Sequence, residues 1–172
     1  NDHIIPTQVP GLDLVPATLQ LAGAEVEMVA LESREYLVRR ALEPVRDRYD
    51  YILIDCPPSL GLLTVNAFTA ADTYLIPVQC EYYALEGLSL LLRTLDSIRK
   101  SLNPDLQLEG ALLTMYDSRT NLSDQVKDEI QAYFKDKMFR SVIPRNIRLA
   151  EAPSYGLPIS LYDPRSKGAQ AY

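Results

Sequence analysis

The chain has 172 residues, a formal net charge of −6 and a hydrophobic content of 47%. This length favours one domain with a real core. No run of apolar residues is long enough to predict a membrane span, and the acidic balance by itself argues against a nucleic-acid-binding protein. Cys56 and Cys80 each lie in or beside an apolar run, so we expect two buried, reduced thiols.

The charge is unevenly distributed along the chain. Residues 138–172 carry five basic and two acidic side chains, a net +3, which leaves −9 for the rest of the chain. The protein could therefore have a locally basic surface although its net charge is negative. The alternative is that these basic residues are ordinary surface charges without a function.

Strands and helices are predicted in alternation from residue 11 onward. Residues 11–16 are predicted to form a strand that ends at a proline, and residues 19–30 a loop and a short helix. Within residues 31–45, mostly apolar residues recur on one side at the spacing of a helix, so we predict a helix there. Ser33 is a plausible cap, and Pro44 lies in the last turn.

A short apolar run, residues 51–54, is rich in β-branched and aromatic side chains and predicts a strand buried on both faces. Asp55 follows this strand, where ligands of α/β sheets bind. The next residues, Pro57, Pro58, Ser59 and Gly61, favour a stiff, tight turn. A strand that ends in Asp before such a loop has the form of a Walker B segment, whose Asp holds Mg²⁺, often through water. The alternative is that Asp55 caps the next helix and the loop is only a rigid turn.

Helical and strand patterns continue to alternate over the second half of the chain. This βαβ pattern predicts an α/β protein with a doubly wound, mostly parallel sheet. The predicted helices are residues 62–70, 84–102, 122–135, 147–152 and one beginning at Ser166, and the predicted strands are residues 73–78, 108–115, 138–143 and 159–162.

Two of these helices have a clear apolar face. On the helix 84–102 this face repeats every three or four residues and is predicted to be buried. On the helix 122–135, which Asn121 or Ser123 is expected to cap, a similar face points inward. The faces consist of Leu85, Leu88, Leu92, Leu95 and Ile98 on the first helix and of Val126, Ile130 and Tyr133 on the second.

Four stretches of the sequence resemble one family. They read YDYILIDCPPSLG at residues 49–61, LLTMYDSRTNLSDQV at 112–126, IPRNIRLAEAPSYG at 143–156 and LYDPRSKGAQAY at 161–172. These segments resemble the ParA/Soj partitioning ATPases, relatives of MinD, and the similarity runs from about residue 11 to the end. The resemblance implies a P-loop NTPase fold of the ParA/MinD type and an ATPase that uses ATP and Mg²⁺.

The phosphate-binding motif of such an enzyme is absent from the sequence. A P-loop ATPase needs G-x-x-x-x-G-K-[ST], and none of the seven glycines begins this pattern. In the family the motif precedes the part that this sequence matches. We therefore expect a fragment that is incomplete at the N-terminus, in which residues 1–172 form a single α/β domain, the Walker B part. The fragment alone is not expected to hydrolyse ATP.

The resemblance also implies roles for individual residues around the nucleotide. Asp55 would position Mg²⁺, through water, and the catalytic water. The turn that Pro57, Pro58, Ser59 and Gly61 form would be switch II. The adenine would lie between two segments. The alternative is that these residues form only loops at the ends of strands. Met115, Tyr116 and Asp117 would border the base, and Pro144, Arg145 and Asn146 would cover its other side.

Arg119 and Arg148 match the arginines with which Soj-type proteins hold DNA phosphates. The planar guanidinium suits this role because it binds phosphate at two points. The alternative for both arginines is a surface salt bridge. Arg145, Arg165 and Lys167 are weaker candidates for the same surface.

For the intact protein, the family implies a cycle that partitions chromosomes or plasmids. The ATP-bound homodimer would bind double-stranded DNA without sequence preference, and a ParB-type centromere-binding protein would stimulate hydrolysis. The protein would be cytoplasmic and nucleoid-associated, with no membrane partner. Two alternatives are a MinD-like ATPase that acts at a membrane and a non-catalytic interaction domain that has lost the P-loop.

Overall fold

The computed structural model describes residues 3–57, 59–82 and 84–172. The chain falls into two compact units, residues 1–70 and 71–172, and each is described here by itself. That the two units form one domain stays a prediction. None of the helices in the described ranges is both long and apolar enough to cross a membrane.

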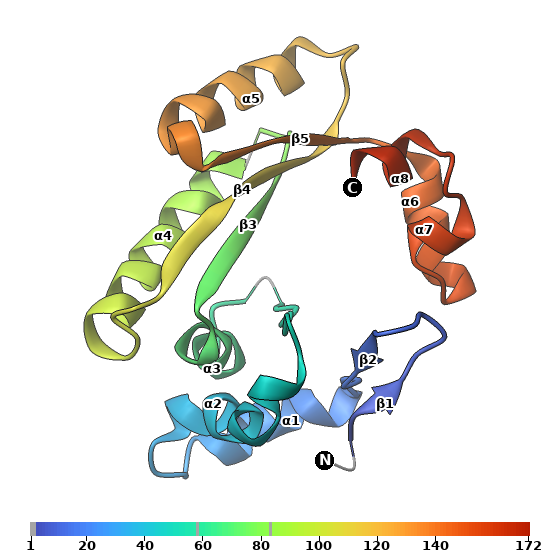
Figure 1. Ribbon diagram of the computed structural model, residues 1–172. Coiled ribbons are helices and arrows are strands. Elements are labelled where there is room, and N and C mark those ends of the chain that lie inside the picture. Colours follow the sequence, from blue (N-terminus) through green and yellow to red (C-terminus); the bar gives the residue numbers. More distant parts are fainter. Residues whose placement is uncertain (1–2, 58, 83) are drawn as a thin grey trace. The chain divides into compact units, whose positions relative to one another are not determined.

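A three-stranded parallel sheet is the centre of the second unit (Figure 1). Its strands are β3 (Thr73–Gln79), β4 (Gln107–Tyr116) and β5 (Met138–Pro144), in the order β3-β4-β5. The connections are α4 (Ala84–Ser101) and α5 (Asn121–Phe134). The three strands follow one another across the sheet in chain order, and crossovers between parallel strands are right-handed. Both connecting helices therefore pack on the same face of the sheet. The predicted α/β fold with a parallel sheet is confirmed.

The core of this unit lies between that face and the two helices. The predicted face of α4 is confirmed for Leu88, Leu95 and Ile98, which are buried, and Leu92 is half-buried. Leu85 lies outside the described side chains. One cluster combines residues from the sheet, from α4 and from α5: Ile76, Val78, Cys80, Leu88, Ala111, Leu113, Val126, Ile130 and Phe134.

The inward face of α5 differs from the prediction at one position. Val126 and Ile130 are buried as predicted, but Tyr133 is 62% exposed, and Phe134 is buried in its place. Phe134 continues the i, i+4 row of the other two, and its ring has no hydroxyl that needs a partner. The cap was also predicted wrongly, because Thr120 is the residue whose side-chain oxygen accepts a backbone N–H, that of Ser123.

Short helices follow β5. The strand predicted at residues 159–162 is wrong, because a helix forms there after Pro158, with the N–H of Asp163 donating to the carbonyl of Ile159. So short a run cannot be assigned by its pattern alone. The helix predicted from Ser166 is confirmed, since the hydroxyl of Ser166 accepts the N–H of Ala169. The elements are α6 (Ile147–Glu151), η4 (Ala152–Tyr155), α7 (Ile159–Tyr162) and α8 (Lys167–Ala171).

The first unit is mostly helical. Its predicted strand at residues 11–16 is confirmed in part, since two of these residues pair in a short antiparallel hairpin. Gly11, at φ 79°, makes the left-handed turn that this hairpin needs. The elements are β1 (Ile5–Pro6), β2 (Asp13–Leu14), α1 (Leu19–Met28), η1 (Arg34–Tyr36), α2 (Leu37–Leu42), η2 (Glu43–Arg48) and α3 (Leu62–Ala70).

Two predictions for this unit are wrong. The helix expected over residues 31–45 is broken into η1, α2 and η2, and Ser33 has a left-handed backbone without a side-chain cap bond. The strand expected over residues 51–54 is absent, and Tyr51 and Leu53 are 86% and 91% exposed. A strand requires a hydrogen-bonded neighbour, and none of the strands in the described ranges pairs with this segment.

Candidate functional site

The two segments predicted to enclose a base lie side by side at the carboxyl edge of the sheet. Tyr116 and Pro144 are register partners on β4 and β5. The backbone N–H of Arg145 donates to the carbonyl oxygen of Tyr116 over 2.8 Å. Because Met115 and Asp117 flank Tyr116, and Asn146 follows Arg145, all six predicted residues lie at or next to this one junction.

Met115 has an unusual backbone at this junction. Its φ is 55°, in the left-handed region, and the β4–β5 register shifts between Leu113 and Tyr116. A left-handed unbranched residue is uncommon and is held in place by its surroundings. The irregularity ends the regular ladder and leaves the Met115 side chain 36% exposed at the sheet edge.

An ion pair spans the ends of the outer two strands. Arg145, after β5, places Nη2 2.9 Å from Oε1 of Glu81, after β3. Both side chains are about half exposed, so the pair adds little stability. Its importance is geometric, because it connects the loops on either side of β4.

Asp117 and Arg119 form a two-point pair beside this junction. Arg119 donates from Nε over 2.9 Å and from Nη2 over 2.7 Å to the two carboxylate oxygens of Asp117. Its backbone N–H also donates to Oδ1 over 3.1 Å. These hydrogen bonds from Arg119 hold the pKa of Asp117 well below its usual range. The guanidinium is otherwise open to solvent, with the Arg119 side chain 83% exposed.

Arg148 lies in a second group of charges, on α6. Its Nη1 is 2.9 Å from Oε2 of Glu151, and its Nε is 3.5 Å from Oδ2 of Asp163. Tyr162 donates its hydroxyl to the same Oε2 of Glu151 over 3.1 Å. The bonds from Arg148 and Tyr162 lower the pKa of Glu151. The backbone N–H of Arg148 donates to Oδ1 of Asn146, which caps α6.

The sequence reasoning missed the carboxylates beside these arginines. Glu151 follows Arg148 by three residues, a spacing that brings side chains together on a helix and could have been noticed. Asp163 and Glu81 are distant in sequence from their partners, so only the fold reveals these pairs. Asp124 was also missed; it accepts the hydroxyl of Tyr116 over 2.6 Å, and this bond raises the pKa of Tyr116.

The predicted Walker B carboxylate lies in the first unit. Asp55 is exposed, in a segment without regular structure. The structure gives no cap bond between Asp55 and α3; it is Glu25, on α1, whose Oε1 accepts the N–H of Leu63 in the first turn of α3 over 3.3 Å. No group of three or more His, Cys, Asp or Glu that could hold a metal is found in the described ranges. A single carboxylate still fits Mg²⁺, which keeps several waters and binds phosphate oxygens.

The other predicted switch II residues surround the start of α3. Ser59 accepts the hydroxyl of Thr64 at its carbonyl over 2.6 Å, and Gly61 accepts the N–H of Val65. Pro57 is exposed, and Pro58 lies outside the described residues. The segment is thus attached to α3 at its end, while its start is exposed.

Sequence comparison identifies the group to which the chain is related. A family model described as an AAA domain matches residues 1–108. The chain is 63% identical over 171 residues to the sporulation initiation inhibitor protein Soj of Bacillus subtilis, covering 99% of this chain and 68% of that protein. It is 58% identical over 167 residues to the chromosome partitioning protein ParA of Myxococcus xanthus, covering 97% and 59%. The chain belongs to the ParA/Soj family of partitioning ATPases.

Solved structures show the fold of the chain. The cobyrinic acid a,c-diamide synthase of Mycobacterium smegmatis, with bound ATP analog and magnesium, matches with a TM-score of 0.78 and 36% identity, over 90% of this chain and 68% of that one. The cell division ATPase MinD of Pyrococcus furiosus, at 23% identity, matches with a TM-score of 0.74 over 99% and 65%, and shows the fold alone. The predicted ParA/MinD-like P-loop NTPase fold is confirmed. The chain spans about three fifths to two thirds of its relatives' length.

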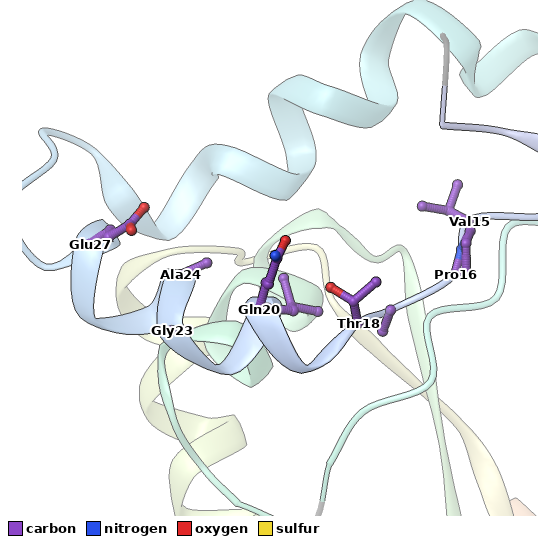
Figure 2. A pocket seen from close by; sticks show the side chains of 9 residues that line it. Val15, Pro16, Thr18, Gln20, Gly23, Ala24 and Glu27 are labelled. Carbon is purple, nitrogen blue, oxygen red and sulfur yellow. The ribbon is translucent and has the colours of Figure 1, made fainter.

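A hollow in the first unit is separate from all residues that the ParA/Soj resemblance singles out. It has a volume of about 730 Å³ and runs along α1 (Figure 2). Small and apolar side chains dominate its walls, and Thr18, Gln20 and Glu27 are polar. The lining residues are Val15, Pro16, Ala17, Thr18, Gln20, Leu21, Gly23, Ala24 and Glu27. No predicted catalytic or binding residue is among them.

Proposed function

We propose that this chain supplies the adenine-binding edge and the Mg²⁺-positioning carboxylate of an ATPase for chromosome or plasmid partitioning. One observation carries the proposal: the register pair of Tyr116 and Pro144, joined by the bond from Arg145 to Tyr116, brings two distant ParA/Soj-like segments to one sheet edge. Ligands of α/β sheets bind at such carboxyl edges.

The residues at this edge suit an adenine ring. Met115 and Pro144 offer apolar surface for its faces, and the carboxylate of Asp117 and the amide of Asn146 offer hydrogen-bonding groups for its rim. Asp55 would hold Mg²⁺ through water, and the metal would neutralise phosphate charge when bound. Pro57, Pro58, Ser59 and Gly61 would respond to the nucleotide state as switch II. The 172-residue chain by itself, which contains no G-x-x-x-x-G-K-[ST] motif, is proposed to be inactive.

DNA binding would follow from nucleotide binding. In an ATP-bound homodimer, Arg119 and Arg148 would contact phosphates of double-stranded DNA, with Arg165 and Lys167, both exposed, as weaker contributors. Phosphate contacts carry no sequence information, so binding would be non-specific. A ParB-type protein would stimulate hydrolysis and release, and the protein would work in the cytoplasm, on the nucleoid.

The proposal is tested in the whole protein, by which we mean a chain that spans the full length of its relatives. We expect ATP to drive its dimerisation and its binding to two DNA duplexes of unrelated sequence with equal affinity. Binding to anionic lipid vesicles without DNA binding would favour the MinD-like alternative. Failure to bind ATP at all would favour the non-catalytic domain.

A further inference from the structure

The carboxylates beside Arg148 bind the same part of its side chain that a phosphate would need. A guanidinium grips phosphate best through two parallel N–H donors. In this structure Nη1 is directed to Glu151 and Nε to Asp163, at 2.9 Å and 3.5 Å. A guanidinium offers two such pairs of donors, Nε with Nη2 and Nη1 with Nη2, so each pair of Arg148 has one donor that faces a carboxylate.

Arg119 is engaged by one carboxylate at both donors of a pair. Arg119 directs Nε and Nη2 to the two oxygens of Asp117, at 2.9 Å and 2.7 Å. Arg119 lies in the turn between β4 and α5, whereas Arg148 lies on α6, and their acidic partners come from different parts of the chain. At both arginines, carboxylates therefore occupy donors that a phosphate would use.

We propose that Glu151 and Asp163 are internal competitors for Arg148 that set how tightly the protein holds DNA, and that Asp117 does the same at Arg119. The inference rests on the proposed DNA role of the two arginines. A phosphate that approaches must displace a carboxylate, so part of its binding free energy is spent on breaking an existing pair. The pairs are exposed and individually weak, which makes them displaceable rather than permanent.

The bond from Tyr162 to Glu151 strengthens this competition at Arg148. It holds the carboxylate in place, and the Tyr162 ring is stacked on Tyr155 at 4.9 Å between centroids. A carboxylate that is already ordered loses little freedom when it binds the arginine. Removing Glu151 should therefore have a larger effect than removing an ordinary surface carboxylate.

The test is a DNA-binding titration of the whole protein, saturated with a non-hydrolysable ATP analogue, on a labelled duplex of arbitrary sequence. Glu151→Gln keeps the size of the side chain and removes its charge. Glu129→Gln, at an exposed carboxylate on α5, is the matched control for losing one negative charge. We expect Glu151→Gln to tighten binding about two- to five-fold, the range that a weak ion pair implies, and more than the control does. Asp163→Asn should act in the same direction.

Each substitution is repeated in an Arg148→Ala background, where the extra gain of Glu151→Gln over Glu129→Gln should disappear. An equal gain for both variants, a gain that survives without Arg148, or weaker binding by Glu151→Gln would overturn the inference. Wild-type affinity of the Arg148→Ala protein would instead contradict the proposed DNA role itself. Circular dichroism and ATP-dependent dimerisation confirm that each variant is folded. If Glu151→Gln does not fold, the same comparison is made with Asp163→Asn.

Discussion

Asn66, in the middle of α3, accepts the backbone N–H of Val38 with its side-chain oxygen over 3.1 Å. Its amide nitrogen donates to the carbonyl oxygens of Arg34, over 2.8 Å, and Leu62, over 3.0 Å. The side chain is fully buried, so these bonds replace water entirely. Asn66 therefore joins α3, which follows the proposed switch II turn, to the segment from η1 to α2.

Substitution of Asn66 by alanine should strongly destabilise the first unit. It leaves the half-buried N–H of Val38 and the carbonyl groups of Arg34 and Leu62 with fewer partners, and we expect a loss of about 2–4 kcal/mol in the free energy of unfolding. Urea titration of the 172-residue chain measures this loss. Asn121→Ala, at an exposed position at the start of α5, is the control and should change the free energy by less than about 0.5 kcal/mol. Equal effects would show that the Asn66 bonds contribute no specific stability.

The Asp117 carboxyl should titrate well below the ordinary aspartate pKa. Arg119 lowers its folded-state pKa, so the pair contributes stability above the unfolded pKa of about 3.9, and this contribution is lost as the pH falls through the folded-state pKa. Carboxyl ¹³C NMR follows the titration directly. In Arg119→Ala the pKa of Asp117 should rise toward about 3.9. An unchanged low pKa in this variant would mean that another group stabilises the carboxylate.

Sequence pattern predicted the buried face of α4, which packs against the sheet, and placed Leu88, Leu95 and Ile98 correctly. The bounds predicted for α3 in the first unit, residues 62–70, also agree with the structure. Spacing was insufficient to choose between Tyr133 and Phe134, which lie on neighbouring sides of α5. That choice depends on where the sheet lies, which periodicity does not encode.

The wrong predictions concern segments whose secondary structure depends on contacts with other parts of the chain. Residues 51–54 are apolar enough for a buried strand, yet a strand also needs a neighbour to pair with. Residues 159–162 form a helix, and Tyr162 bonds to Glu151 and stacks on Tyr155. At the candidate site, the residues themselves were predictable from resemblance. The pair of Glu81 and Arg145, 64 positions apart, was not.

Asp55→Ala should strongly impair ATP hydrolysis by the whole protein. It removes the carboxylate proposed to orient Mg²⁺, a contribution of roughly 3 kcal/mol or more, which is at least about a hundred-fold in rate. Steady-state phosphate release is the measurement. Asp50→Ala, at an exposed aspartate five residues earlier, should leave the rate almost unchanged. Nearly wild-type turnover in Asp55→Ala would remove Asp55 from the mechanism.

Arg119→Ala and Arg148→Ala should each weaken DNA binding by the ATP-bound protein and flatten its salt dependence. Each lost phosphate contact lowers the slope of log affinity against log salt by about 1, because fewer counterions are released. Salt titrations of DNA binding measure the slope, and Arg140→Ala, at an exposed arginine on β5, is the control. Dimerisation should persist in both variants. If both keep the wild-type slope and affinity, the two arginines form only surface ion pairs.

The most direct test of the proposed nucleotide site is hydrogen–deuterium exchange of the whole protein with and without an ATP analogue and Mg²⁺. We predict slower exchange of the backbone amides at residues 115–117 and 145–146 when the nucleotide is bound, because both segments would enclose the base. The amides along α1 that line the hollow in Figure 2 should not change. Unchanged exchange at both sheet-edge segments, with protection along α1 instead, would contradict the assignment of this edge as the adenine site.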